Sequence, residues 1–281
     1  MDSSLKKQLE IDAAKIRLHI IDGTFHAKSG HPGGSLSITE TIAYLYRCVL
    51  KVNPKDPKNP DRDRFVLSKG HTAPALYGAL AIHGFFPEDE IPRLRKVGAI
   101  LQGHPDMQKT PGVDMSTGSL GQGVSAACGM ALAAKLDKKD YRVFAVLGDG
   151  EIEEGQVWES AMFASHKKLD NLCLIVDNNN LQIDGSLDQV NSPHPIPDKF
   201  KAFGFHVFEA DGHDFESLET AFNQVTASSG KPCVIILKTV KGHGVSFMEN
   251  QVGWHGKATN PEEYEIAMNE LRENLKKCEE A

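Results

Sequence analysis

The sequence predicts an α/β fold in which helices cover both faces of a mainly parallel β-sheet, giving three layers (α/β/α). Two observations carry this prediction. Continuous apolar runs rich in β-branched residues alternate with segments of helical periodicity, and such runs are typical of parallel strands buried on both faces. The chain has 281 residues, 40% apolar and 25% charged. This size and composition favour a single domain over residues 1–281 with a substantial core.

The N-terminal part of the chain is predicted to be helical. Ser37 followed three residues later by Glu40 is typical of a capping box that opens a second helix. The Pro-rich stretch 53–60 is predicted to be a surface loop. One face of the first helix carries Leu5, Leu9, Ala13, Ile16 and Ile20, and the second buries Ile42, Leu45 and Val49.

Strands and helices are then predicted to alternate. The expected strands are 64–67, 141–147, 172–176, 205–208 and 233–240. The expected helices are 72–83, 121–136, 154–168, 214–227 and 261–277. In such folds ligands bind outside the carboxyl ends of the strands, so the loops at that edge are where a site is expected.

Composition and charge exclude several classes of protein. The formal net charge is −7, and without a long Lys/Arg run this argues against nucleic acid or a membrane surface as a partner. No apolar stretch approaches the ~18 residues of a membrane helix. The N-terminus lacks a signal-peptide core, so we expect a cytoplasmic protein. Five widely spaced cysteines indicate reduced thiols, and no Cys or His pair has zinc-ligand spacing.

Polar residues follow two successive apolar runs. Gly148-Asp149-Gly150 comes directly after the run 141–147, and Asp177-Asn178-Asn179-Asn180 follows the next one. The spacing is about that of one βαβ unit, so a right-handed crossover would bring both strand ends together. Carboxylate and amide oxygens suit magnesium or calcium, and flanking glycines let the backbone approach an anion. The sequence therefore predicts a diphosphate held through a metal ion.

These residues and their surroundings resemble the transketolase family. Gly148-Asp149-Gly150 followed by Asn178-Asn179 is similar to the thiamine-diphosphate motif of these enzymes. The other motifs of the resemblance are Ser29-Gly30-His31-Pro32-Gly33, Ser68-Lys69-Gly70-His71, Gly103-His104-Pro105, Thr117-Gly118-Ser119-Leu120-Gly121-Gln122-Gly123, Ile183-Asp184-Gly185 and Trp254-His255-Gly256. They run through nearly the whole chain in the family's order, which implies a thiamine-diphosphate-binding fold of the diphosphate (PP) type.

The resemblance implies a role for each matched residue. The metal, magnesium or else calcium or manganese, would be held by Asp149, Asn179 and the backbone carbonyl of Leu181. The diphosphate would contact His71, His255 and residues 148–151, that is Gly148, Asp149, Gly150 and Glu151. Gly118 and Leu120 would lie near the aminopyrimidine of thiamine diphosphate, and Ile183 near its thiazolium. The catalytic set would be His31 and His104, which bind ketose hydroxyls, His255, and Glu154 in a proton-linked network across the subunit interface.

The implied activity is the transfer of a two-carbon ketol unit between ketose and aldose phosphates. In the family, a pyrimidine-binding domain and a C-terminal domain complete the enzyme, and this chain matches only the first domain. We therefore expect one subunit of a split transketolase, inactive alone. Its partner would carry the pyrimidine domain, and two such pairs would form a heterotetramer.

Other functions remain open at this point. The chain could be the diphosphate-binding subunit of a 2-oxoacid dehydrogenase or of a deoxyxylulose-phosphate synthase, a non-catalytic transketolase-like binding module, or an excised domain of a longer enzyme. Gly121-Gln122-Gly123-Val124-Ser125-Ala126 also fits a dinucleotide fingerprint, but no strand is predicted before it. We interpret that segment as a closely packed helix.

Overall fold

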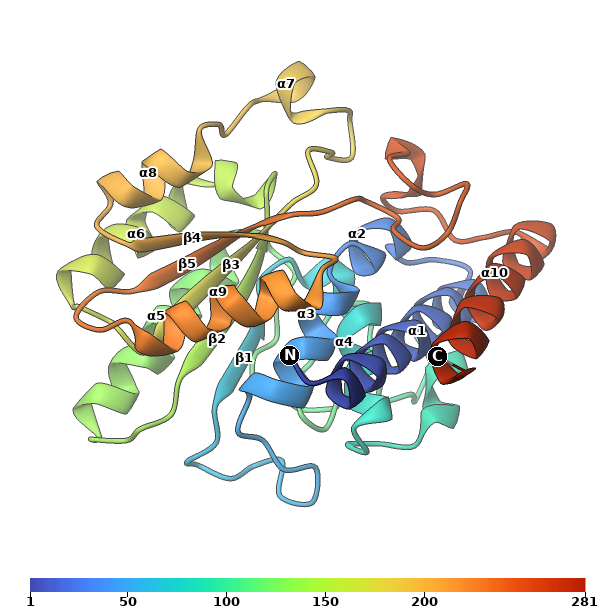
Figure 1. Ribbon diagram of the computed structural model, residues 1–281, viewed down its shortest axis with the longest axis horizontal. Coiled ribbons are helices and arrows are strands. Elements are labelled where there is room, and N and C mark those ends of the chain that lie inside the picture. The colour runs from blue at the N-terminus through green and yellow to red at the C-terminus, as the bar shows by residue number, and fades with distance from the viewer. Residues whose placement is uncertain (281) are drawn as a thin grey trace.

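One parallel five-stranded sheet organises the molecule, as the computed structural model in Figure 1 shows for residues 1–280. The strand order is β1-β2-β3-β5-β4, and every neighbouring pair is parallel. The predicted α/β class is confirmed. The strands are β1 (Arg64–Leu67), β2 (Val143–Gly148), β3 (Leu172–Asn178), β4 (His206–Asp211) and β5 (Cys233–Lys238).

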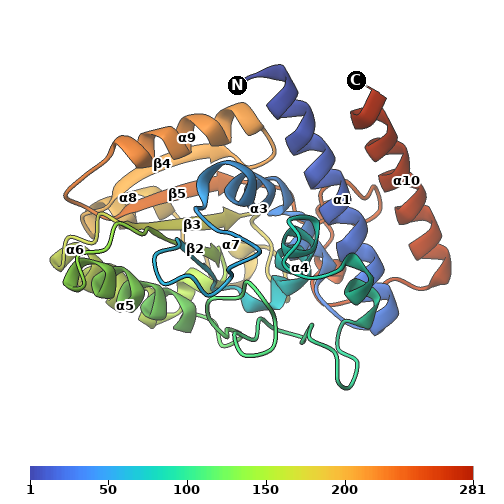
Figure 2. The ribbon, with the colours of Figure 1, turned by 90° about the horizontal axis from the view of Figure 1, so that it is seen from below.

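Helices cover both faces of the sheet, and Figure 2 shows α9 and α3 on one side and α5 and α6 on the other. All the predicted helices of the alternating region are present, with ends shifted by a few residues. The helices are α1 (Ser3–Ala27), α2 (Pro32–Leu36), α3 (Thr39–Tyr44), α4 (Ala73–Ile82), α5 (Gln122–Leu136), α6 (Gly155–His166), α7 (Leu187–Val190), α8 (Ile196–Ala202), α9 (Phe215–Ala227) and α10 (Pro261–Glu280).

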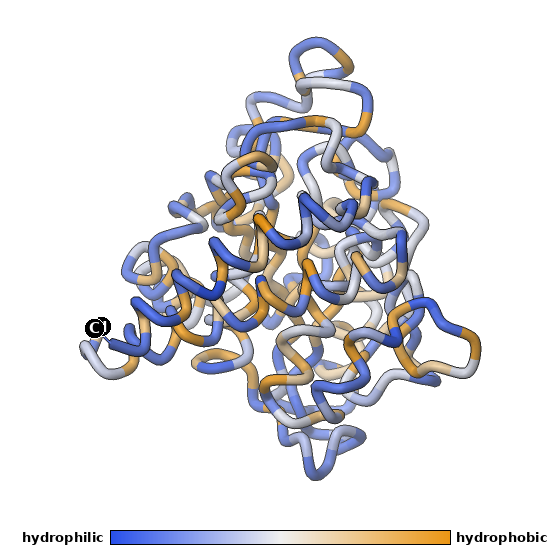
Figure 3. Tube along the Cα trace, turned by 90° about the vertical axis from the view of Figure 1, so that its right-hand side faces the viewer, coloured by the Kyte–Doolittle hydropathy of each residue, from blue (hydrophilic) through white to orange (hydrophobic). Residues whose placement is uncertain are grey.

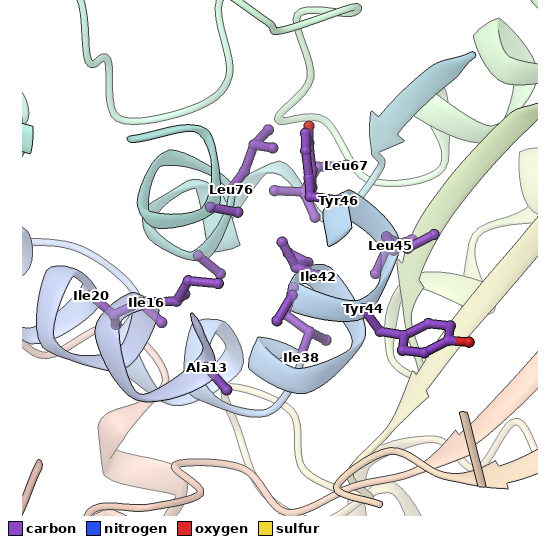
Figure 4. Packing of buried hydrophobic residues seen from close by; sticks show 14 of the residues in the cluster. Ala13, Ile16, Ile20, Ile38, Ile42, Tyr44, Leu45, Tyr46, Leu67 and Leu76 are labelled. Atoms are coloured by element: carbon purple, nitrogen blue, oxygen red, sulfur yellow. The ribbon is translucent and has the colours of Figure 1, made fainter. Parts of the chain in front are cut away.

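The molecule has two hydrophobic cores, one on each face of the sheet, because successive side chains of a strand point to opposite faces. Phe144 and Val146 of β2 point to the side of α1, α3, α4 and α9, whereas Ala145 and Leu147 point to the side of α5, α6 and α8. All four of these side chains are buried. Because β2 is buried on both faces, its sequence is a continuous apolar run. In Figure 4, Ile16 of α1 and Ile42 of α3 point toward one another beneath α4.

The second helix differs from its prediction. Helix α3 spans only Thr39–Tyr44 and continues as a π-helical turn over Leu45–Val49. The predicted capping box at Ser37 and Glu40 is wrong. The Ser37 hydroxyl donates to the Gly34 carbonyl (3.0 Å) and to Asp177 Oδ2 (2.6 Å), and Glu40 pairs with Arg17. Both side chains therefore bond to tertiary partners, Asp177 of β3 and Arg17 of α1, and not to the backbone of the helix terminus. Of the predicted buried face, Ile42 and Leu45 are buried and Val49 is only half-buried.

Helix α10 closes the molecule by lying antiparallel against α1 (Figure 2). Tyr264 stacks on Phe25 at 3.9 Å between ring centroids and donates its hydroxyl to Asp22 Oδ1 (2.8 Å). Figure 3 shows hydrophilic residues along the outer turns and apolar residues toward the interior. Within residues 1–280, no helix combines the length and apolar character needed to cross a membrane.

Candidate functional site

A cavity of about 320 Å³ lies at the carboxyl ends of β2, β3 and β5. This is the edge at which ligands bind in parallel α/β sheets. Most of the residues predicted for the site line it: His31, His71, Gly118, Leu120, Gly148, Asp149, Gly150, Glu151, Asn179, Leu181, Ile183 and His255. The remaining lining residues are Gly34, Lys69, Asp177, Gln182 and Lys241.

The three predicted metal ligands lie together on one wall of this cavity. Strands β2 and β3 are neighbours in register, with Gly148 opposite Asp177, so the loops that follow them start side by side. Asp149 Oδ1 accepts from Gly150 N (2.9 Å) and Oδ2 accepts from Asn180 N (2.6 Å). Asn180 has a φ of 62°, a left-handed conformation that Asn tolerates, and it forms the sharp turn between Asn179 and Leu181.

The charge on Asp149 is only partly compensated. Burial raises the pKa of its carboxyl, and the negative charge of Asp177 raises it further, to about 7, against the opposing effect of backbone N–H groups and Lys241. A divalent cation bound here would restore the ionised carboxylate. Carboxylate, amide and carbonyl oxygens are also the donor set that magnesium prefers. The residues present therefore fit a metal ion.

Asp177 lies beneath this wall as the centre of a buried hydrogen-bond network. Its carboxylate pairs with the ammonium of Lys69, and both side chains are almost fully buried. It also accepts from the hydroxyls of Ser37 and Thr239 and from Asn179 Nδ2 (3.0 Å). Burial raises the pKa of Asp177, but Lys69 outweighs burial and the net shift is downward. An ionised Asp177 thus orients the amide of Asn179.

Lys241 supplies the second cation of the cavity. Its Nζ donates to the Leu181 carbonyl (2.7 Å) and to His255 Nδ1 (2.9 Å). Burial lowers the pKa of this amine to about 8, although Asp149 and Asp177 raise it in opposition. Lys69 and Lys241 therefore place positive charge beside glycine backbone, a combination suited to a phosphate group.

Three histidines also line the cavity, with their rings close together. The ring centroids of His31, His71 and His255 are 5.1–5.6 Å apart. Burial, followed by neighbouring cationic groups, lowers the pKa of His31 to about 4 and that of His255 to about 3, and brings His71 well below its ordinary value. All three rings are neutral near pH 7, so each offers one N–H donor and one acceptor. His31 Nδ1 is buried and lacks a hydrogen-bond partner within residues 1–280, so it is free for a ligand.

Two predicted site residues lie outside the cavity wall as residues 1–280 define it. His104 is exposed and stands beside Gly118, where an added Cβ would lie 3.3 Å from the imidazole. Glu154 is exposed and occupies the position just before α6. Burial lowers the pKa of His104, with Arg95 adding to the shift. His104 therefore sits at the rim, and Glu154 lies at the outer surface of the chain.

Glu151 lines the cavity, but its carboxylate is engaged by the protein itself. It accepts from Ser68 Oγ (2.5 Å) and from the backbone N–H groups of Gly121 and Gly148 (both 3.0 Å). Burial raises the pKa of this carboxyl. The side chain fastens three loops of the site to one another.

Sequence reasoning missed Lys69, Asp177, Gln182, Gly34 and Lys241 as lining residues. Lys69 and Asp177 stand inside the predicted motifs, but without a predicted role. Lys241 directly follows the apolar run 233–240, so the rule that ligands bind at strand carboxyl ends could have found it. Gln182 and Gly34 carry no signal in sequence, because their place depends on how their loops fold.

Comparison with known proteins places these residues in context. The family described as "Transketolase, thiamine diphosphate binding domain" matches residues 8–276. A "6-deoxy-6-sulfo-D-fructose transketolase subunit SqwG" of Clostridium sp. strain MSTE9 is 47% identical over 242 residues, covering 86% of this chain and 88% of the relative. An apulose-4-phosphate transketolase subunit of Phocaeicola vulgatus is 41% identical, and the match covers 96% of both chains.

Solved structures give the same match. The transketolase of Campylobacter jejuni aligns with a TM-score of 0.90 and 33% identity over 97% of this chain. The alignment spans only 43% of that longer chain. This chain thus spans less than half the length of the solved transketolase, but nearly the full length of the two relatives named as subunits.

Proposed function

Because this chain belongs to the transketolase family, we propose that it is the diphosphate-binding subunit of a two-chain transketolase. The observation that carries the proposal is the difference in coverage. The chain spans 96% of the Phocaeicola vulgatus relative, which is named as a subunit, but only 43% of a solved transketolase. A second chain would supply the pyrimidine-binding domain, and two such pairs would assemble as a heterotetramer.

The residues of the cavity support thiamine diphosphate and magnesium as its ligands. Asp149, Asn179 and the Leu181 carbonyl would hold the metal, with calcium or manganese as alternatives. His71, His255 and the backbone at Gly150 would bind the diphosphate. When bound, thiamine diphosphate supplies the electron sink of ketol transfer, while the protein orients the substrates and handles protons.

The remaining predicted residues have roles in binding the substrate and the thiamine rings. The neutral imidazoles of His31 and His104 would hydrogen-bond the hydroxyls of the ketose donor. Leu120 and Ile183 would pack against the thiamine rings, with Gly118 allowing close approach. Glu154 is exposed and would meet another chain, as the family resemblance implies.

The substrates are proposed to be sugar phosphates, from which a two-carbon unit passes from a ketose to an aldose. The names of the relatives indicate variation at the far end of the donor. One is named for 6-deoxy-6-sulfo-D-fructose and the other for apulose 4-phosphate. A sulfonated ketose is therefore a specific second candidate donor for this chain.

An activity assay tests the proposal directly. The chain is incubated with thiamine diphosphate, magnesium, ribose 5-phosphate and one donor at a time: xylulose 5-phosphate, apulose 4-phosphate or 6-deoxy-6-sulfofructose. It is tested alone and together with the protein encoded beside it. Turnover only in the mixture would support the two-chain proposal. Normal turnover by the chain alone would refute it, and no turnover in the mixture would favour a non-catalytic binding module.

A further inference from the structure

The turn that carries Lys241 is bonded, on the side away from the cavity, to a second group of polar residues made of buried Arg17 and Glu40 and half-buried His213. This turn, residues 240–243, is closed by a hydrogen bond from His243 N to the Val240 carbonyl (3.2 Å) and is called the Lys241 turn below. On one side Lys241 lines the cavity. On the other side Arg17, Glu40 and His213 line a separate hollow.

Both ends of the Lys241 turn are bonded to this second group. Val240 N donates to His213 Nε2 (2.9 Å), and Arg17 Nε donates to the His243 carbonyl (3.1 Å). Glu40 joins the two contacts, because its carboxylate pairs with Arg17 and accepts from His213 Nδ1 (3.0 Å). The backbone on either side of Lys241 is therefore held by one closed network that comes from α1, α3 and the loop before α9.

The hydrogen bonds assign a definite tautomer to His213. Since Nε2 accepts the Val240 N–H, a neutral ring carries its proton on Nδ1 and donates it to Glu40. Burial raises the pKa of Glu40, but Arg17, His213 and His243 together lower it to about 2, so the carboxylate is ionised. An ionised Glu40 holds His213 with its acceptor nitrogen facing the Lys241 turn.

We propose that His213 is a positioning residue that, oriented by Glu40 and Arg17, holds the Lys241 turn in the conformation that places Lys241 in the cofactor cavity. The proposal rests on the proposed function, because the turn matters for activity only if the cavity binds thiamine diphosphate. The contacts of the turn itself do not depend on that function.

A metal site at the same place is the main alternative. Ligand atoms of Glu40, His213 and His243 lie within 4.8 Å of one another. Arg17 already forms an ion pair with Glu40, however, and the two ring nitrogens of His213 already form hydrogen bonds with Val240 N and the Glu40 carboxylate. A cation would lie beside the guanidinium and would have to displace these bonds, so the geometry favours positioning over metal binding.

Two substitutions of His213 test the roles of its two ring nitrogens one at a time. His213→Asn retains a donor near Nδ1 but is too short to accept from Val240, whereas His213→Gln can place an oxygen near the former Nε2. His206→Asn is the matched control, because His206 lies at the opposite end of the sheet, where β4 begins. Amide hydrogen exchange is measured on the full chain of each variant, over residues 240–244.

In His213→Asn, exchange over residues 240–244 is expected to rise about tenfold, the factor that loss of one net hydrogen bond implies. His213→Gln and His206→Asn should stay within about twofold of the unsubstituted chain. Equal exchange in His213→Asn and the unsubstituted chain, or a tenfold rise in His213→Gln as well, would overturn the proposal. So would stoichiometric Zn²⁺ binding in calorimetry that His213→Asn abolishes.

The second readout uses the chain assembled with its partner. His213→Asn should raise the thiamine diphosphate concentration for half-maximal activity about tenfold, with little change in kcat at saturating cofactor, and His213→Gln should restore it. A fall in kcat alone would contradict positioning of the cofactor site. If no variant, nor the unsubstituted pair, turns over sugar phosphates, the proposed function fails, while the exchange experiment still decides the positioning role.

Discussion

Two buried carboxyl groups of the cavity, Asp149 and Asp177, differ in the direction of their pKa shifts. Asp149 is buried with its two oxygens accepting only backbone N–H groups, and its pKa of about 7 lies far above the ordinary value of 3.8. Asp177, by contrast, has Lys69 as a permanent counter-ion. Two carboxylates at neighbouring strand ends therefore have pKa values shifted in opposite directions, that of Asp149 upward and that of Asp177 downward.

Replacing Asp149 with Asn should weaken metal-dependent thiamine diphosphate binding by ~100-fold or more, because an uncharged amide is a poorer magnesium ligand. The same change should stabilise the metal-free chain. A folded-state pKa raised to about 7 means that the native carboxyl is harder to ionise, so stability falls as pH rises from about 4 to about 7. Asp149→Asn removes this loss, which is on the order of 2–4 kcal/mol at pH 8.

Calorimetry of cofactor binding to the assembled pair and urea unfolding of the metal-free chain at pH 5 and pH 8 would test both effects. Asp198→Asn, an exposed change in α8, is the control and should alter neither. Unchanged cofactor affinity in Asp149→Asn would remove the metal assignment.

Glu40 should give the opposite dependence on pH. Its folded pKa of about 2 lies below the ordinary 4.5, so its stabilisation is complete above about pH 4.5 and is lost as pH falls toward 2. Glu40→Gln leaves Arg17 buried without a counter-charge and should destabilise the chain by about 3–5 kcal/mol at pH 6. Urea unfolding from pH 3 to 6 would check this, and an equal acid slope in Glu40→Gln and the unsubstituted chain would contradict the assignment.

At the scale of elements, the site depends on how closely α2 approaches the segment that follows β5. Gly33 accepts a hydrogen bond from Gly242 N (2.9 Å). A Cβ added at Gly33 would lie 2.7 Å from the Trp254 carbonyl oxygen and 3.1 Å from Lys241 Cγ. Helix α2 and the segment carrying Lys241 and His255 are thus in backbone contact, which only glycine permits here.

Gly33→Ala should therefore destabilise the chain by about 1–3 kcal/mol, since rigid backbone must move to admit the methyl group. Gly129→Ala is the matched control: the residue is exposed in the middle of α5, and an added Cβ meets nothing within 4 Å. That variant should be more stable by about 0.5–1 kcal/mol, because alanine favours the helix. Thermal unfolding of both would measure the difference, and equal effects would show that α2 can shift freely.

At the scale of the whole molecule, the residues proposed to bind the cofactor differ in how far they are exposed to solvent. The side chains of the proposed metal ligands Asp149 and Asn179 are buried, whereas two of the residues proposed to meet the thiamine rings are exposed to solvent. Leu120 is 36% exposed and Ile183 is 62% exposed. Ile183 stands at the tip of a hairpin closed by the pairing of Leu181 with Ser186. Apolar side chains left open beside a polar cavity are expected to be covered by another surface.

The isolated chain should accordingly bind magnesium pyrophosphate and magnesium thiamine diphosphate with affinities within about threefold, since the rings find little to bury against. Adding the partner chain should raise the affinity for thiamine diphosphate at least about tenfold and leave that for pyrophosphate nearly unchanged. Calorimetric titrations with each ligand would test this. A tenfold preference for thiamine diphosphate in the isolated chain would mean that this chain binds the rings by itself.

Sequence by itself determined the layered fold and the place of the site at the carboxyl ends of the strands. Unbroken apolar runs can be buried on both faces only in a covered parallel sheet, and the order of strands fixed Asp149 and Asn179 at one edge. Both conclusions follow from local pattern and handedness, which do not depend on side-chain packing. The proposed roles of the site residues, His31, His104 and Glu154 among them, came from family resemblance, and they all stay predictions.

Only the tertiary structure decided the partners of charged side chains. Glu40 and Ser37 fit a helix cap in sequence, yet Arg17, His213 and Asp177 outcompete the helix terminus for them. Lys69 lies in the cavity for a similar reason, because its ammonium pairs with Asp177. A buried charge must find compensation wherever the fold offers it, and that partner can stand more than a hundred residues away, as Asp177 does from Lys69.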